Sequence, residues 1–156
     1  MNYTLVIASI LIFASLCSVM LAVDTGKPVI RVFYKNKKPS QKALEKINEA
    51  LDNYRDLYQI HYHDIEDEIN RELILDLGLP STHFPVAVVI EGKFTAQFGD
   101  RIASFVHFPT FMHGIGRHEG NWSIADLEAA LKDNDLLLEE NILPELEEGE
   151  TEGECE

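Results

Sequence analysis

The stretch that decides the fold is residues 28–47, PVIRVFYKNKKPSQKALEKI. Its first part, PVIRVFY, is rich in β-branched and aromatic residues, which predicts a buried strand. Ser40 is suited to the N-cap of a helix, and apolar residues recur at helical spacing after it. The residues expected on the inner face of this helix are Ala43, Leu44, Ile47, Ala50, Leu51 and Tyr54. The junction 38–41 is therefore predicted to lie at the N-terminus of a helix.

The next segment repeats the pattern of a strand followed by a helix. Residues 56–65, DLYQIHYHDI, alternate between two faces and predict a second strand. Residues 64–78, DIEDEINRELILDLG, predict a second helix that ends at Gly78, because glycine suits the left-handed conformation after a helix. The residues expected to face inward on this helix are Ile69, Leu73, Ile74 and Leu77.

The remainder of the predicted domain contains a hairpin and a closing helix. Residues 84–98, FPVAVVIEGKFTAQF, predict a strand, a tight Glu-Gly turn and a return strand. Residues 101–120 follow without a clean period. Residues 123–133, SIADLEAALKD, predict a helix in which Ser123 and Asp126 form a capping-box-like pair.

The predicted order of elements is β-α-β-α-β-β-α. A helix joins the first two strands, so these strands should be parallel with a right-handed crossover. The strands of the hairpin should be antiparallel. We therefore expect an α/β fold, a three-layer sandwich with a mixed four-stranded sheet and helices on both faces.

Negative charge is concentrated at the C-terminal end of the chain. The 156 residues carry a formal net charge of −14, and residues 139–156 contain nine Glu and no Lys or Arg. The residues before them hold 18 acidic and 13 basic side chains, a net charge of −5. Nucleic-acid binding is not expected, because phosphate contacts need a basic face. We expect residues 139–156 to form an acidic, disordered tail.

An apolar leader precedes the predicted domain. Residues 4–23 contain no charged side chain, and about 20 apolar residues suffice to span a bilayer. Residues 1–23 are therefore predicted to be a signal peptide or an N-terminal membrane anchor. In both cases we expect export to a periplasmic, extracellular or lumenal space, with membrane association through residues 4–23 if the leader is retained. The two cysteines, Cys17 and Cys155, lie in the leader and at the end of the tail, so they cannot cross-link the domain.

The order of elements and two sequence marks resemble the thioredoxin superfamily over residues 28–133. The first mark is the strand that leads directly into the first helix, and the second is STHFPVAVVIEGK (81–93), with a proline directly before the third strand. The resemblance implies a CxxC active site in the first turn of the helix, where the helix dipole lowers the pKa of a thiol. Here the two cysteine positions fall on Lys38 and Gln41. The thiol–disulfide oxidoreductase activity of the family is therefore not expected.

The resemblance also implies a binding surface. In the family, the proline before the third strand is cis and faces the active-site turn, and the strand edge beside it takes the backbone of a bound peptide. We carry this geometry over to Pro85 and to the turn before the first helix. The residues predicted for this surface are Lys38, Pro39, Ser40, Gln41, Phe84 and Pro85. No catalytic residue is predicted.

The irregular segment is rich in aromatic residues and histidines, and two interpretations of it stay open. The aromatic residues either pack as core over one end of the sheet or form a lid over a ligand or partner, since long irregular segments in compact domains are often functional. The predicted lid residues are His107, Phe108, Phe111, His113 and Trp122.

Six histidines raise the alternative of a metal site. His61 and His63 lie two residues apart on a predicted strand, a spacing at which two imidazoles can share a metal ion. No dense ligand motif such as HExxH is present, and we predict neither a metal nor a cofactor.

Two classes of function remain open. The sequence favours an exported, non-catalytic binding or assembly module with a protein or peptide partner. The alternative is a thioredoxin-like enzyme or metal-binding protein that uses histidines or a borrowed thiol. Lys35, Lys37, Lys38 and Lys42 around the junction would suit an acidic partner or the Glu-rich tail of this chain itself, or they form only a solvated loop.

Overall fold

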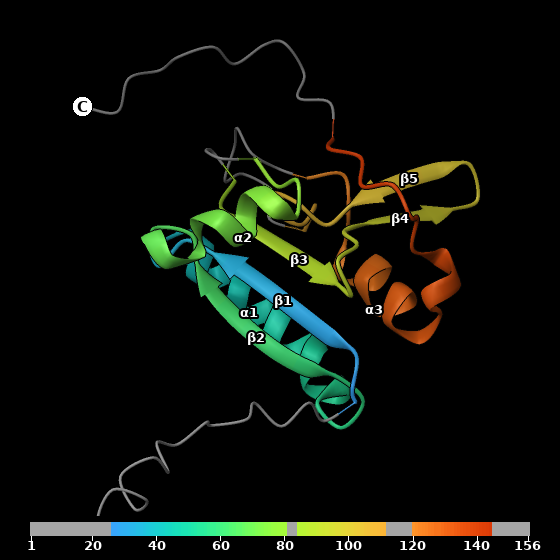
Figure 1. Cartoon of the computed structure of the whole chain (residues 1–156). Coiled ribbons are helices and arrows are strands. Elements are labelled where there is room, and N and C mark those ends of the chain that lie inside the picture. Colours follow the sequence, from blue (N-terminus) through green and yellow to red (C-terminus); the bar gives the residue numbers. More distant parts are fainter. Residues whose placement is uncertain (1–25, 81–83, 112–119, 145–156) are drawn as a thin grey trace, which may run out of the picture.

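The computed structural model describes residues 26–80, 84–111 and 120–144 (Figure 1). The strands are β1 (Val29–Tyr34), β2 (Gln59–Asp64), β3 (Val86–Ile90), β4 (Thr95–Phe98) and β5 (Arg101–Ser104). The α-helices are α1 (Ser40–Leu51), α2 (Arg71–Asp76) and α3 (Ile124–Lys132), and short 3-10 turns are η3 (Asp52–Tyr54), η4 (Glu68–Asn70) and η5 (Asn134–Leu136). Of the helices in these ranges, none has the length and apolar character needed to cross a bilayer.

The larger sheet has three strands in the order β2-β1-β3. β1 pairs with β2 in parallel over all six residues and with β3 in the antiparallel sense. The prediction of parallel first and second strands, joined by α1, is therefore confirmed, and so is the mixed character of the sheet.

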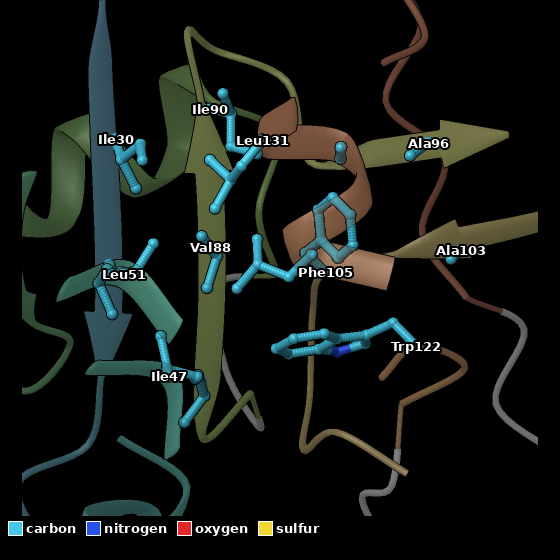
Figure 2. Packing of buried hydrophobic residues seen from close by; sticks show 14 of the residues in the cluster. Ile30, Ile47, Leu51, Val88, Ile90, Ala96, Ala103, Phe105, Trp122 and Leu131 are labelled. Carbon is cyan, nitrogen blue, oxygen red and sulfur yellow. The ribbon is translucent and has the colours of Figure 1, made fainter. Parts of the chain in front are cut away.

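Helices cover both faces of this sheet (Figure 1). Alternate residues of the strands point to opposite sides, so each face builds its own cluster. On one face, Ile30 and Val88 pack with residues of α1 and α3 such as Ile47 and Leu131 (Figure 2). On the other face, residues of β1 and β3 pack with Ile74 of α2. β3 contributes to both clusters, and all five of its residues are buried.

The predicted four-stranded sheet is replaced by two separate sheets. The segment after the Glu-Gly turn pairs with β3 only through the Ile90–Lys93 bridge, and β4 pairs instead with β5. β5 lies in the segment for which the sequence predicted no regular structure. The free edge of β3 is taken by Phe105, whose carbonyl accepts a hydrogen bond from the Val88 N–H at 2.9 Å. That later segment occupies the place where the return strand was expected.

The second helix is shorter than predicted. α2 begins at Arg71, and the residues before it form η4. Ile69, predicted to face inward, lies in η4 and is 81% exposed, so that prediction is wrong. Ile74 is buried, while Leu73 and Leu77 pack against the core from partly buried positions.

Glu139, Asn141 and Ile142, which the sequence assigned to a disordered tail, form hydrogen bonds with residues 92–95 after β3 and at the start of β4. The Asn141 side chain accepts a hydrogen bond from the Phe94 N–H at 2.7 Å and donates one to the Gly92 carbonyl at 2.9 Å. The Ile142 N–H donates to the Thr95 hydroxyl at 2.9 Å. One amide therefore ties the turn after β3 to the C-terminal segment. The rest of the predicted tail, residues 145–156, lies outside the described residues.

Replacing Asn141 by Ala should lower the free energy of unfolding by about 2 kcal/mol, because the N–H of the buried Phe94 is left without its acceptor. Urea denaturation followed by tryptophan fluorescence measures the effect. The neighbouring Glu140→Ala, at an exposed position, should change stability by less than about 0.5 kcal/mol. Equal stability of Asn141→Ala and wild type would show that the segment does not hold the turn.

Candidate functional site

The junction and the start of β3 lie at the same end of the sheet. The Lys35 N–H donates to the Pro85 carbonyl oxygen at 3.0 Å, which continues the β1–β3 ladder one step beyond the strands. The chain then turns through Lys38–Gln41 into α1. The two parts of the predicted binding surface are thus brought to one corner of the domain, formed by the C-terminal end of β1, the N-terminus of α1 and the start of β3.

Phe84 and Pro85 do not form the surface that the resemblance implied. Among the described residues the cis peptide bond joins Lys38 to Pro39, so the expectation of a cis bond at Pro85 is not met. Phe84 is 2% exposed and belongs to the cluster on the α2 face. Pro85 is half-buried, and its carbonyl is held by β1. The backbone here enters β3 as part of the sheet, which leaves little of it for a partner.

The turn before α1 supplies the accessible part of the corner. Lys38, Pro39 and Gln41 are exposed, whereas Ser40 is 2% exposed. Ser40 is the first residue of α1 and not its N-cap, because Pro39 occupies that position and offers no side-chain cap. The Gln41 side chain donates to the Asn36 side-chain oxygen at 3.3 Å. The turn therefore presents three exposed side chains above a buried Ser40.

Positive charge gathers around this turn. Lys35 and Lys37 both lie beside Glu66, at 3.4 and 2.7 Å. The hydrogen bond from Lys37, together with the charges of both lysines, holds the pKa of Glu66 below its ordinary value. Lys38 and Lys42 form no ion pair with the described part of the chain.

Around this turn the four lysines carry four positive charges and Glu66 one negative charge, in a chain whose net charge is −14. Asp64, which lies in register with Tyr34 on the neighbouring strand, adds a second negative charge near Lys35. The first turn of α1 holds no acidic residue, so no carboxylate there offsets the positive end of the helix dipole. We call this set, Lys35, Lys37, Lys38, Lys42 and Glu66 around the N-terminus of α1, the lysine corner. The sequence indicated its lysines, but not Glu66, which is 29 residues away from Lys37.

The lysine corner has the chemistry of a binding surface and lacks that of a thiol enzyme. Disulfide exchange needs a thiolate, and the positions that the resemblance aligns with cysteines carry an amine and an amide, at Lys38 and Gln41. Cys17 and Cys155 both lie outside the described residues. Ammonium groups, a side-chain amide and a helix N-terminus can instead hold carboxylates by charge and hydrogen bonds.

Three of the predicted lid residues are core residues. His107 and Phe108 are 4% exposed and Trp122 is fully buried. The Trp122 indole N–H donates to the Val106 carbonyl at 3.1 Å, and its ring meets Phe105 edge to face (Figure 2). These positions agree with the first of the two interpretations of the segment, core packing over the sheet. His113 lies outside the described residues.

The fourth described lid residue, Phe111, is 37% exposed and lines a shallow groove of about 420 Å³ between α1 and α3. The other lining residues are Lys46, Glu49, Ala50, Ser123, Ile124, Ala125 and Glu128. Sequence analysis did not predict this groove, because it forms where two helices that are far apart in the sequence meet. Of the lining residues, the sequence assigned only Phe111 to a possible binding role.

The two histidines on β2 lie close together. Their rings are stacked with centroids 6.5 Å apart, and His63 Nδ1 is 3.0 Å from the side-chain oxygen of Asn70. Within the described ranges no group of three or more His, Cys, Asp or Glu side chains is arranged to hold a metal ion. The other three histidines outside the β2 pair and the core, His83, His113 and His118, are not described.

Comparisons with protein-family models, with curated proteins and with solved structures gave no match for this chain. The candidate site is defined by the placement and chemistry of its own residues.

α3, which forms one side of the groove, begins with a capping box that includes a charged carboxylate. Ser123 and Asp126 form a capping box at the start of α3, as the sequence predicts. Burial favours the neutral form of Asp126, but hydrogen bonds from Arg101 and Ser123 outweigh it and lower the pKa of the carboxyl below 3.8. The Arg101 guanidinium lies 2.5 Å from the carboxylate and comes from β5. This contact ties α3 to the smaller sheet.

Replacing Asp126 by Asn should therefore cost about 1 kcal/mol of stability at pH 7. Because the folded-state pKa lies below the unfolded value, the wild-type advantage is present above pH 3.8 and is lost as the pH falls through the folded-state pKa. Urea denaturation of both proteins at neutral and strongly acidic pH measures this. Asp100→Asn, which removes the same charge from an exposed loop position, should show no such pH-dependent difference. A difference of the same size at both pH values would contradict the role of the carboxylate charge.

Proposed function

We propose that this chain is an exported, thioredoxin-like binding module without redox activity, which holds an acidic segment of a partner protein at the lysine corner. The observation that carries the proposal is the gathering of four lysines, two of them without an ion pair in the described part of the chain, at a helix N-terminus whose first turn holds no acidic residue, in a chain of net charge −14. Export depends on the apolar residues 4–23, which lie outside the described ranges.

The arrangement of elements supports the thioredoxin-like part of the proposal. β1 leads into α1 and runs parallel to β2, the sheet is mixed, and helices lie on both of its faces, in keeping with the expected three-layer arrangement. Pro85 stands at the start of β3 beside the end of β1. The departures are the separate β4–β5 sheet and the bond before Pro85, which is not cis.

Charge supports an acidic partner over a neutral or basic one. Lys37, Lys38 and Lys42 are exposed, so carboxylates can approach them without displacing core residues. A patch of one sign on a surface of opposite net charge directs the approach of complementary ligands, and salt weakens this attraction. Most of the binding free energy should therefore be sensitive to ionic strength.

Reversing two of these charges, in Lys38→Glu/Lys42→Glu, should weaken binding of a hexaglutamate peptide at least about tenfold, which corresponds to about 1.4 kcal/mol. The peptide serves as a minimal acidic probe, and NMR titration at low salt gives both the affinity and the location. In the wild type, the amide signals of residues 35–42 should shift most.

The matched control is Lys27→Glu/Lys132→Glu, which changes the net charge by the same amount at exposed positions away from the corner. Lys27 precedes the opposite end of β1, and Lys132 ends α3. An equal loss of affinity in this control would show that the peptide responds to net charge and not to the lysine corner.

The alternative, an enzyme that uses histidines or a borrowed thiol, is tested by a separate assay. In the insulin-reduction assay with dithiothreitol, the protein should give no rate above the background, because the turn at residues 38–41 contains no sulfur. Clear turnover would favour the enzyme over the binding module. A metal content close to one ion per chain would favour the metal-binding alternative.

A further inference from the structure

The outer edge of β2 leaves the backbone groups of Ile60 and Tyr62 unpaired within the described part of the chain. The Gln59 N–H donates to Pro28 and the Ile65 N–H to Tyr34, so odd-numbered residues of β2 point toward β1. Even-numbered residues therefore direct their N–H and C=O groups away from the sheet. The backbone groups of Ile60 and Tyr62 form no hydrogen bond with the described residues on that side.

Both ends of this edge are closed. Before it, the Tyr58 N–H donates to the Tyr54 carbonyl at 2.9 Å. After it, the Asp64 carbonyl accepts from the Asn70 side chain at 2.9 Å and from the Asp67 N–H at 3.2 Å. The open edge therefore includes the N–H and C=O groups of Ile60 and Tyr62, and it is limited by the bonded Tyr58 N–H at one end and the bonded Asp64 carbonyl at the other.

The edge has none of the usual features that prevent strand pairing. Soluble proteins protect exposed edges with lysines, prolines, bulges or a covering element. Residues 59–63, QIHYH, contain no charged residue other than titratable histidines and no proline, and all six residues of β2 stay in register with β1. His61 and Tyr62 are exposed, so side chains beside the edge are accessible as well.

A second copy of the same strand fits this edge by its own symmetry. In an antiparallel pair about a two-fold axis at His61, Ile60 exchanges both hydrogen bonds with Tyr62 of the second copy, and Tyr62 does the same with Ile60 of the second copy. This satisfies the open groups of Ile60 and Tyr62 and does not use the Tyr58 N–H or the Asp64 carbonyl, which are bonded within the chain. No lysine, arginine, aspartate or glutamate faces a like charge, because the paired segment contains none of these.

We propose that two copies of this chain associate through β2, in an antiparallel pair centred on His61. Tyr62 then lies against Ile60 of the second copy on the α1 face, where its hydroxyl donates to Asn48 at 2.8 Å. His61 lies opposite His61 of the second copy on the α2 face, beside His63, which stacks on Phe33. The four backbone hydrogen bonds define a small, reversible interface. The lysine corner takes no part in this interface. The proposal of pairing through β2 is therefore independent of the proposal that the lysine corner binds an acidic partner.

The register is tested by His61→Cys in the full chain, with Cys17 and Cys155 replaced by Ser. In a directly opposed pair that is not hydrogen-bonded, the Cα atoms lie about 4.5 Å apart, within the range of a disulfide. Mild oxidation in cells followed by non-reducing electrophoresis should show a covalent dimer. It should form at least about tenfold faster than for Gln97→Cys, an exposed position on β4, because paired strands hold the thiols at high effective concentration.

A second variant tests the backbone itself. Adding Tyr62→Pro to His61→Cys removes an N–H that β1 does not use, and an edge strand tolerates proline at such a position. The yield of covalent dimer should fall at least about fivefold, whereas Tyr62→Thr, which keeps the N–H, should retain most of it. The proposal is overturned if His61→Cys cross-links no faster than Gln97→Cys, or if Tyr62→Pro and Tyr62→Thr give equal yields. If His61→Cys cross-links no faster than Gln97→Cys, the edge of β2 would instead be available to pair with an extended segment of another protein.

Discussion

The burial of β3 on both faces is the constraint on which the rest of the structure depends. Val86, Val88 and Ile90 contribute to the cluster shared with α1 and α3, and Ala87 and Val89 contribute to the cluster shared with α2. A strand that is buried in this way must satisfy its backbone groups within the protein, because water cannot reach them. β1 does so on one side, and Lys93 with the segment around Phe105 does so on the other. β3 is thus an interior strand, and β2 is left at the outer edge of the sheet.

The elements predicted best from the sequence are those whose local pattern agrees with their place in the fold. β1, α1 and α3 carry clear periods and are covered on the side that the period indicates, as the burial of Ile30, Ile47 and Leu127 shows. The return strand after Gly92 is present as β4, but its predicted pairing with β3 was wrong. Its local pattern is that of a strand, but pairing depends on which segment competes for the edge of β3, and Phe105 lies far along the chain. The role of Asn141 likewise depends on a contact across 47 residues, which composition cannot reveal.

The candidate site could be predicted only in part, because local sequence patterns identify exposed turns but not the contacts between segments that are far apart in the chain. Lys38, Pro39 and Gln41 are exposed because a turn between a buried strand and an amphipathic helix must face solvent. Phe84 was assigned to the surface by resemblance, but an apolar ring next to a buried strand gains more by entering the core, and it does. Glu66 could not be identified as a member of the corner, because the pairing of exposed charges depends on which loops meet. The groove beside Phe111 could not be predicted, because it depends on how α1 and α3, which are far apart in the sequence, lie against each other.

A helix N-terminus that would lower the pKa of a thiol also stabilises any other negative group placed near it, because the same dipole acts in both cases. The start of α1 can therefore attract carboxylates without any sulfur atom, provided that the side chains around it are cationic. Here they are lysines, and one shared glutamate keeps two of them in place. If two copies pair through β2 in the antiparallel sense, the two corners lie at opposite ends of the joined sheet, since β1 runs parallel to β2. An acidic partner with two such segments would then bind both corners, and its affinity would exceed that of either alone without any new contact.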